Sequence, residues 1–166
     1  MNIVVNLNKE DFWRFNRFAL FHLPKYRNMM LAAFVGIPVL FFAALKLTGS
    51  GWAYSIIAGL VLGGVCDLYF VYRIKSKTMK LVKDNDGILG EHLVAIDERG
   101  LHESTVKNHS RYAWNGIQQL RMDKDYLYIF VNSLQAVIIP KRSFSGQKEE
   151  LEFAEAVERY SRQKFE

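Results

Sequence analysis

The residue types that most often do chemistry are scattered along this chain rather than grouped in a recognisable pattern. The four histidines, His22, His92, His102 and His109, have no metal-ligand spacing to one another or to the single cysteine, Cys66. The chain has neither a glycine-rich phosphate loop nor the elbow motif of a serine hydrolase. We therefore expect no catalytic residue, no cofactor and no metal, and a role other than that of an enzyme.

One acid, Asp67, lies inside a long apolar stretch and ends a series of residues spaced four apart. The series is Ser55, Gly59, Gly63 and Asp67, and this spacing places all four on one face of a helix. Small residues let helix backbones approach closely in lipid, so the face predicts packing against the preceding helix or against a second copy in a homodimer. For Asp67 we expect structural pairing, with an ion- or proton-linked role as the alternative.

A group of basic residues near the C-terminus is the other candidate site. Lys141 and Arg142 follow Pro140 directly, and Lys148 comes soon after. These cations predict a surface for an anionic partner, either a lipid headgroup or an acidic protein segment. The alternative is a solvated connection between a strand and a helix.

The face that contains Asp67 belongs to the second of two apolar runs, which fall at about 29–47 and 51–72. Between Met29 and Tyr72 the only charges are Lys46 and Asp67. Each run reaches the roughly 20 helical residues that span the hydrocarbon core of a bilayer. Their apolar character continues all the way round the helix, which disfavours a pair of core helices in a soluble protein. Residues 29–74 therefore predict a transmembrane hairpin with a short turn, and the bilayer is its first expected partner.

The charges that flank the hairpin predict its orientation. Lys and Arg accumulate before the first run and after the second, whereas the turn offers only Lys46. Because basic residues stay on the cytoplasmic side, both termini are expected there. The net charge of +5 is better explained by anionic lipid than by nucleic acid, since no basic patch is interleaved with stacking aromatics.

Residues 1–28 predict a strand followed by an amphipathic helix. The strand covers residues 2–7, Asn8 is a good N-cap, and the helix runs to about Leu23. This helix is aromatic and basic, which suits the membrane interface, although it could equally pack on the polar domain. We expect the strand to pair into the sheet of that domain and to cover one of its edges.

Residues 84–166 predict a cytoplasmic domain that begins at a turn over 84–87. Six short runs have strand character, at 92–96, 101–105, 111–114, 117–121, 126–131 and 136–139, and a helical pattern follows at 147–164. The fold class expected for the chain is membrane α+β. It combines the two-helix hairpin with a small antiparallel β-barrel or sandwich capped by a C-terminal helix.

Several motifs resemble the YcxB-like family of bacterial membrane proteins. They are Gly90-Glu91-His92, Ile96-Asp97-Glu98-Arg99-Gly100-Leu101, Arg111-Tyr112-Ala113-Trp114, Tyr126-Leu127-Tyr128-Ile129 and Ile139-Pro140-Lys141-Arg142-Ser143-Phe144, together with Lys9-Glu10-Asp11 and Phe15-Asn16-Arg17-Phe18 before the hairpin. The resemblance implies a location in the bacterial inner membrane and a cytoplasmic domain similar to bacterial pleckstrin-homology folds. It implies no established activity and no catalytic residues.

The function expected from these features is that of a membrane-anchored binding or adaptor protein. Its β domain would recognise a protein or a lipid headgroup at the inner leaflet. The sequence does not identify the protein partner. The alternative is an immunity protein that neutralises a membrane-acting or secreted toxin through the hairpin. A third hypothesis, an enzyme or an ion-conducting subunit, depends on Asp67 alone.

Overall fold

The computed structural model describes residues 1–83 and 88–166, except for the side chains of Lys25 and Lys83. The turn predicted over residues 84–87 therefore lies outside the described residues. The chain divides into two compact units, one of Met1–Phe12 with Val82–Glu166 and the other of Trp13–Leu81. We call them the β unit and the hairpin unit, and describe each by itself.

The β unit contains seven strands and a C-terminal helix, in close agreement with the predicted elements. Its strands are β1 (Asn2–Leu7), β2 (Gly90–Asp97), β3 (Gly100–Ser104), β4 (His109–Tyr112), β5 (Gln119–Met122), β6 (Tyr126–Phe130) and β7 (Ala136–Pro140). Short 3₁₀ turns cover Trp114–Gly116 and Lys141–Ser143, and helix α4 spans Gln147–Ser161. The first residues of α1 (Lys9–His22) also belong to this unit.

The N-terminal strand β1 is the edge of a four-stranded antiparallel sheet with the order β1-β2-β3-β4. It pairs with β2 from Asn2 opposite Ala95 to Leu7 opposite Gly90. Its side chains alternate strictly, so Val5 is fully buried while Val4 is 53% exposed. The predicted pairing of this strand with the C-terminal domain is confirmed, although more than 80 positions separate the two strands.

A second antiparallel sheet has the order β5-β6-β7. Its middle strand β6 is buried at all five positions, because both of its faces are covered. Among the described residues no ladder joins β4 to β5 or β1 to β7, so the barrel form of our prediction is wrong: the strands form two sheets. A barrel and a pair of facing sheets require the same alternation of inward and outward residues, and for that reason the pattern did not separate them.

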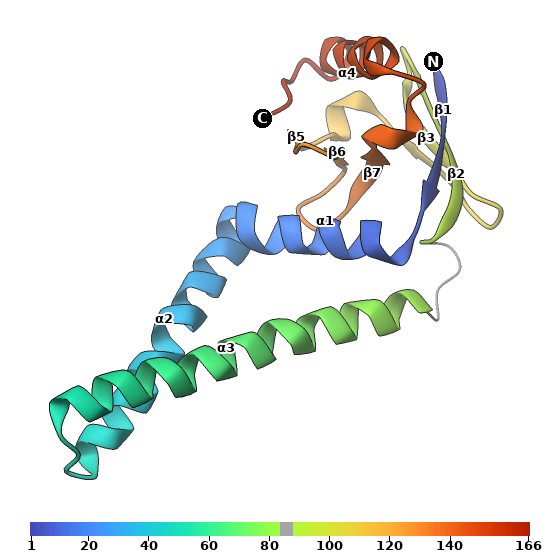
Figure 1. The fold of residues 1–166 in the computed structure, drawn as a ribbon. Coiled ribbons are helices and arrows are strands. Elements are labelled where there is room, and N and C mark those ends of the chain that lie inside the picture. The colour runs from blue at the N-terminus through green and yellow to red at the C-terminus, as the bar shows by residue number, and fades with distance from the viewer. Residues whose placement is uncertain (84–87) are drawn as a thin grey trace. The chain divides into compact units, whose positions relative to one another are not determined.

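Helix α4 covers one end of the sheets, where Figure 1 shows it in red. Phe153 and Val157 on its apolar face are fully buried, and the ring of Phe144 lies 5.5 Å from that of Phe153. The ring of Tyr160 stacks on Trp114 at 5.5 Å. These aromatic contacts fasten the helix to the turns that follow β7 and β4, which completes the core of the unit.

The hairpin unit consists of α2 (Pro24–Leu47), most of α3 (Trp52–Lys83) and the remainder of α1. The turn between α2 and α3 is short, and Gly49 adopts φ +82° there, a conformation that glycine adopts without strain. Both helices exceed the predicted limits, since α2 begins at Pro24 and α3 continues to Lys83. At 1.5 Å per residue, the 32 residues of α3 extend about 48 Å.

The two long helices carry their apolar side chains on the outside. In the most apolar part of each helix, only 6% of the residues of α2 and 22% of those of α3 are buried. Leu40, Val65 and Leu68 are among the most exposed, each above 60%. Helices in the core of a soluble protein are mostly buried, whereas these two are long, apolar and largely bare.

Candidate functional site

The predicted small-residue face of α3 lies against α2 of the same hairpin. A methyl group added at Gly63 would come 2.5 Å from Cα of Pro38, and one added at Gly59 would come 3.0 Å from the backbone nitrogen of Phe42. Both distances are shorter than ordinary van der Waals contact, so glycine is what permits this helix-to-helix approach. The face is therefore filled by α2 over these two turns.

The two polar members of the face are both buried. Ser55 is completely buried, and its hydroxyl donates to the carbonyl of Gly51 at 2.9 Å. Asp67 is 8% exposed, and its Oδ1 atom has no hydrogen-bond partner among the described residues. The structure thus places Asp67 inside the hairpin rather than on its exposed side.

Asp11 is a buried acid of the β unit with several hydrogen-bond partners, and it is 1% exposed. Its position follows from the local sequence, because Asn8 caps α1. The side chain of Asn8 accepts from the amides of Glu10 and Asp11, and Oδ2 of Asp11 accepts from the amide of Asn8 at 2.8 Å. This reciprocal capping fixes the Asp11 carboxylate at the start of the helix.

Two residues that are distant from Asp11 in the sequence complete the Asp11 cluster. Arg142 donates to both carboxylate oxygens, at 2.8 and 2.6 Å, and Tyr126 donates its hydroxyl to Oδ1 at 2.6 Å. Burial by itself raises the pKa of Asp11, but the hydrogen bonds from Arg142, Tyr126 and the Asn8 amide outweigh it and hold the pKa below its ordinary value. Asp11 in turn raises the pKa of Arg142. The cluster is a charged tie between α1, β6 and the turn after β7.

The three basic residues predicted as an anionic-partner surface have separate acidic partners. Arg142 binds Asp11 and also donates to the carbonyl of Asn6. Lys141 lies 3.0 Å from Glu150, and the 92% exposed Lys148 lies 3.8 Å from Glu152. Each of the three cations therefore lies within 4 Å of a carboxylate of the same unit, and the anionic-partner surface stays a prediction.

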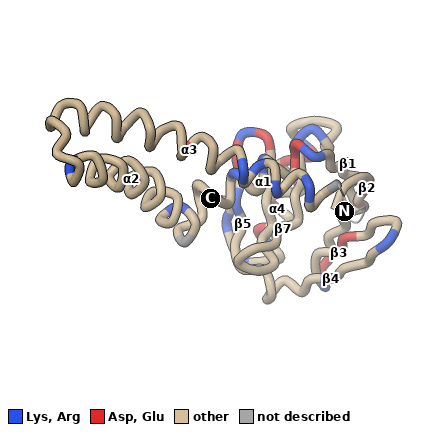
Figure 2. Tube along the Cα trace, turned by 90° about the horizontal axis from the view of Figure 1, so that it is seen from below, with Lys and Arg blue, Asp and Glu red and all other residues tan. Residues whose placement is uncertain are grey.

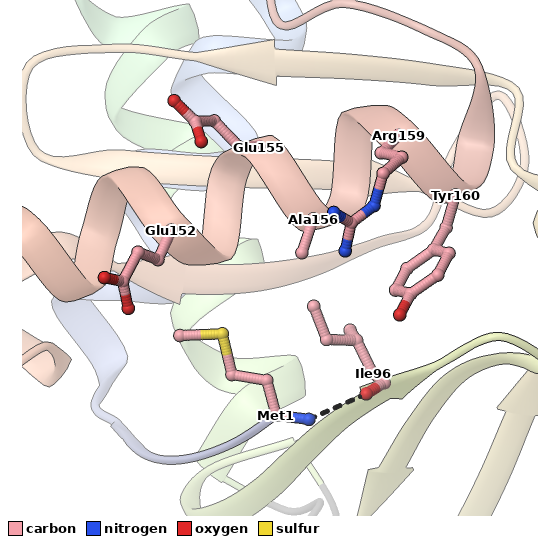
Figure 3. A pocket seen from close by; sticks show the side chains of 7 residues that line it. All are labelled: Met1, Ile96, Glu152, Glu155, Ala156, Arg159 and Tyr160. Carbon is pink, nitrogen blue, oxygen red and sulfur yellow. Dashed lines mark hydrogen bonds between the residues drawn. The ribbon is translucent and has the colours of Figure 1, made fainter.

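A cavity of about 330 Å³ lies between α4 and the paired ends of β1 and β2. In Figure 3 the ammonium group of Met1 donates to the carbonyl of Ile96, at 2.9 Å, on one side of this cavity. The opposite side is formed by α4 side chains, including Glu152, Glu155, Arg159 and Tyr160. Carboxylates and a guanidinium thus line the same hollow.

A buried histidine lies on the inner face of the four-stranded sheet. His92 is 4% exposed, and its Nδ1 atom is 2.8 Å from Oε1 of Glu103 on the neighbouring strand. Its Nε2 atom has no hydrogen-bond partner among the described residues. Within residues 1–83 and 88–166, no group of three or more His, Cys, Asp or Glu side chains is arranged to hold a metal ion.

Comparison with known families gives one match. Residues 96–156 match the family model described as YcxB-like protein. This segment is a YcxB-like domain. It runs from the end of β2 through β3 to β7 and into α4, so the predicted resemblance is confirmed over these residues. No curated protein and no solved structure matches the chain.

The Asp11 cluster joins the YcxB-like domain to a segment outside it. Tyr126 and Arg142 lie within residues 96–156, whereas Asp11 precedes the hairpin. In the sequence, Asp11 stands in the first turn of the helix predicted after Asn8. The spacing of Asn8 and Asp11 was the available signal for a capping pair, but nothing local indicated Tyr126 or Arg142. The small-residue face of α3 lies entirely outside the YcxB-like domain.

Proposed function

We propose that this protein is an integral protein of the bacterial inner membrane that anchors a non-enzymatic binding domain to the cytoplasmic leaflet. The hairpin unit is the anchor, with both termini in the cytoplasm. The β unit, which includes the YcxB-like domain, is a pleckstrin-homology-like module that recognises a partner. The partner is a protein segment or a lipid headgroup.

The observation that carries this proposal is the exposure of the apolar hairpin helices. Leu40 is 70% exposed and Leu68 is 74% exposed, on helices long enough to cross a bilayer. A contiguous apolar surface of this size is unfavourable in water and favourable in lipid. Basic residues gather at the open end of the hairpin and Lys46 stands alone near its turn, which supports cytoplasmic termini.

The organisation of the β unit supports a binding role. Antiparallel sheets of four and three strands closed by a C-terminal helix are compatible with a pleckstrin-homology-like module. Its cavity beside α4 is lined by charged side chains that do not pack in the core. We propose this cavity as the recognition surface for a charged protein segment.

Site-specific photo-crosslinking in cells tests the binding role. A photoreactive amino acid at Glu155 samples the cavity, and one at Leu40 samples the outside of the hairpin. We expect an adduct with a protein from Glu155, lost when Arg159→Glu reverses the charge of the cavity's one arginine and kept in Lys124→Glu, a matched change on the exposed β5–β6 turn. Extraction of membranes with alkaline carbonate tests the anchor, and the chain should stay in the pellet.

The same experiment separates the binding role from the immunity role predicted as the alternative. Adducts from Leu40 without any from Glu155 would favour a function carried by the hairpin, as a toxin-neutralising protein requires. Adducts from Glu155 that persist in Arg159→Glu would remove the cavity from the proposal. Recovery of the chain in the soluble fraction after carbonate extraction would end the anchoring role.

A further inference from the structure

The charges of this chain are divided unequally between its two units. The hairpin unit, residues 13–81, has nine basic residues and a single acid, Asp67, which is a net charge of +8. The remaining residues have thirteen basic and sixteen acidic side chains, a net charge of −3, and together these give the +5 of the whole chain. Figure 2 shows the long helices as mostly tan, with their blue residues near the helix ends.

Four of these basic residues lie at the open end of the hairpin, and we call Arg27, Arg73, Lys75 and Lys77 the basic collar. Gly63 faces Pro38 and Gly59 faces Phe42, and by count along the two helices this pairing continues from Arg27 to the positions around Arg73 and Lys75. Arg27 and Arg73 each stand 21 or 22 residues from the turn, which is about 32 Å of helix. This length matches the roughly 30 Å of hydrocarbon that a span must cross.

The collar is not neutralised within its own unit. Across the described part of the chain, no ion pair links Arg27, Arg73 or Lys77 to a carboxylate, and all three side chains are exposed. The one acid of the unit, Asp67, is buried inside the hairpin. Exposed cations at the depth of the headgroups, with no internal counter-charge, are complementary to phosphate groups.

Aromatic rings lie beside two members of the collar. The Nζ atom of Lys75 is 5.6 Å from the centre of the Trp13 ring, and the guanidinium of Arg73 is 5.9 Å from that of Tyr69. Both distances are within the range of cation–π attraction. Trp and Tyr favour the membrane interface, so these pairs hold the cations where headgroups are found.

We propose that the basic collar binds the phosphate groups of anionic phospholipids and retains them around the open end of the hairpin. This proposal rests on the membrane anchoring proposed above. It assigns a ligand to a part of the chain outside the YcxB-like domain. It also goes beyond the general tendency of Lys and Arg to stay on the cytoplasmic side, because it predicts that particular lipids bind there. Such a site would enrich anionic lipid around the open end of the hairpin.

Tryptophan quenching by brominated lipid tests the proposal on the full chain. Trp13 contacts the collar, whereas Trp52 lies at the opposite end of α3 beside the single cation Lys46. Two single-tryptophan forms, W52F/W114F and W13F/W114F, are reconstituted in mixed vesicles of phosphatidylglycerol and phosphatidylcholine. In each mixture only one of the two lipids is brominated.

At Trp13 we expect brominated phosphatidylglycerol to quench with a selectivity of about fivefold or more, the contribution of one basic residue near an anionic surface. The selectivity should fall as salt is raised and disappear in R73Q/K75Q/K77Q. It should persist in R99Q/K124Q/K148Q, which removes the same charges from exposed sites of the β unit. At Trp52 the two lipids should quench equally.

Equal quenching of Trp13 by both lipids, with Trp52 quenched, would overturn the lipid site while leaving the anchor in place. Equal selectivity at Trp13 and Trp52 would also overturn it, because the preference would then belong to the whole hairpin. If neither tryptophan were quenched by either lipid, the chain would not be inserted, and the anchoring role would fail first. Circular dichroism on each variant establishes that its helices are retained.

Discussion

Arg142 holds the buried carboxylate of Asp11 with two hydrogen bonds of 2.8 and 2.6 Å across 131 positions of sequence. The hairpin helices and strands β2 to β7 lie between these two residues in the sequence. The pair therefore closes the chain on itself just where it leaves the β unit for the hairpin. A tie of this kind fixes the start of α1 on the β unit.

Removing the charge of Asp11 should destabilise the β unit. We expect D11N to lower the free energy of unfolding by about 2–3 kcal/mol, since charge-assisted hydrogen bonds are lost and Arg142, which is half exposed, keeps part of its hydration. Y126F removes one hydrogen bond and should cost about 1 kcal/mol. Urea unfolding in detergent measures both, with E152Q as the control that removes an exposed ion pair. Equal stability of D11N and E152Q would show that the pair contributes nothing.

The stability conferred by Asp11 should depend on pH in one direction. Its pKa is depressed in the folded chain relative to the ordinary 3.8, so the unfolded chain takes up the proton first. The contribution is complete above the ordinary value and is lost as the pH falls through the lower folded value. The stability gap between wild type and D11N should accordingly be constant near neutrality and shrink below about pH 4. A gap unchanged into that acidic range would contradict the assignment.

The approach of α3 to α2 should tolerate no side chain at Gly63. G63A places a methyl group 2.5 Å from Cα of Pro38, and because backbone cannot move aside freely we expect a loss of about 1–3 kcal/mol in hairpin stability. G64A and G36A add the same methyl where nothing lies within 4 Å, and they should be neutral. Thermal unfolding of the helices in detergent compares the three. Because alanine favours helix over glycine, a loss of stability in G64A as large as in G63A would contradict the packing explanation.

Strand β1 should stabilise the β unit through one face only. V5A removes methyl groups from a fully buried position and should cost about 1.5–3 kcal/mol, whereas V4A changes a side chain that is 53% exposed and should stay within about 0.5 kcal/mol. The two residues are neighbours on the same strand, so backbone effects are matched. Chemical unfolding followed by near-ultraviolet circular dichroism gives both values. Similar costs for the two variants would argue against the register of β1 on β2.

The pattern of the sequence was enough to predict most elements and one long-range pairing. Alternation at Ile3, Val5 and Leu7 indicated a strand with one buried face, and the uncharged runs after Met29 and Gly51 indicated the hairpin. The ends of the helices were less predictable. Hydropathy alone predicts an end near Tyr72, because Arg73 ends the apolar run. Lys and Arg favour helix, however, and α3 continues to Lys83.

The Asp11 cluster could not be predicted because its members share no local pattern. Asp11 reads as a helix-capping acid, Tyr126 as a strand aromatic and Arg142 as a solvated turn residue. Only the packing of α1 on the sheets brings them within hydrogen-bond distance. The same packing places the guanidinium of Arg142 on Asp11, a partner that the charge and position of Arg142 in the sequence did not indicate.

Thiol labelling in spheroplasts tests the central claim, that the hairpin crosses the membrane with the β unit in the cytoplasm. In a C66A background, G51C reports on the turn, where an added Cβ meets nothing within 4 Å, and K148C reports on the exposed start of α4. A membrane-impermeant maleimide should label G51C in intact spheroplasts and K148C only after lysis. Labelling of K148C in intact spheroplasts, with G51C protected until lysis, would contradict the account.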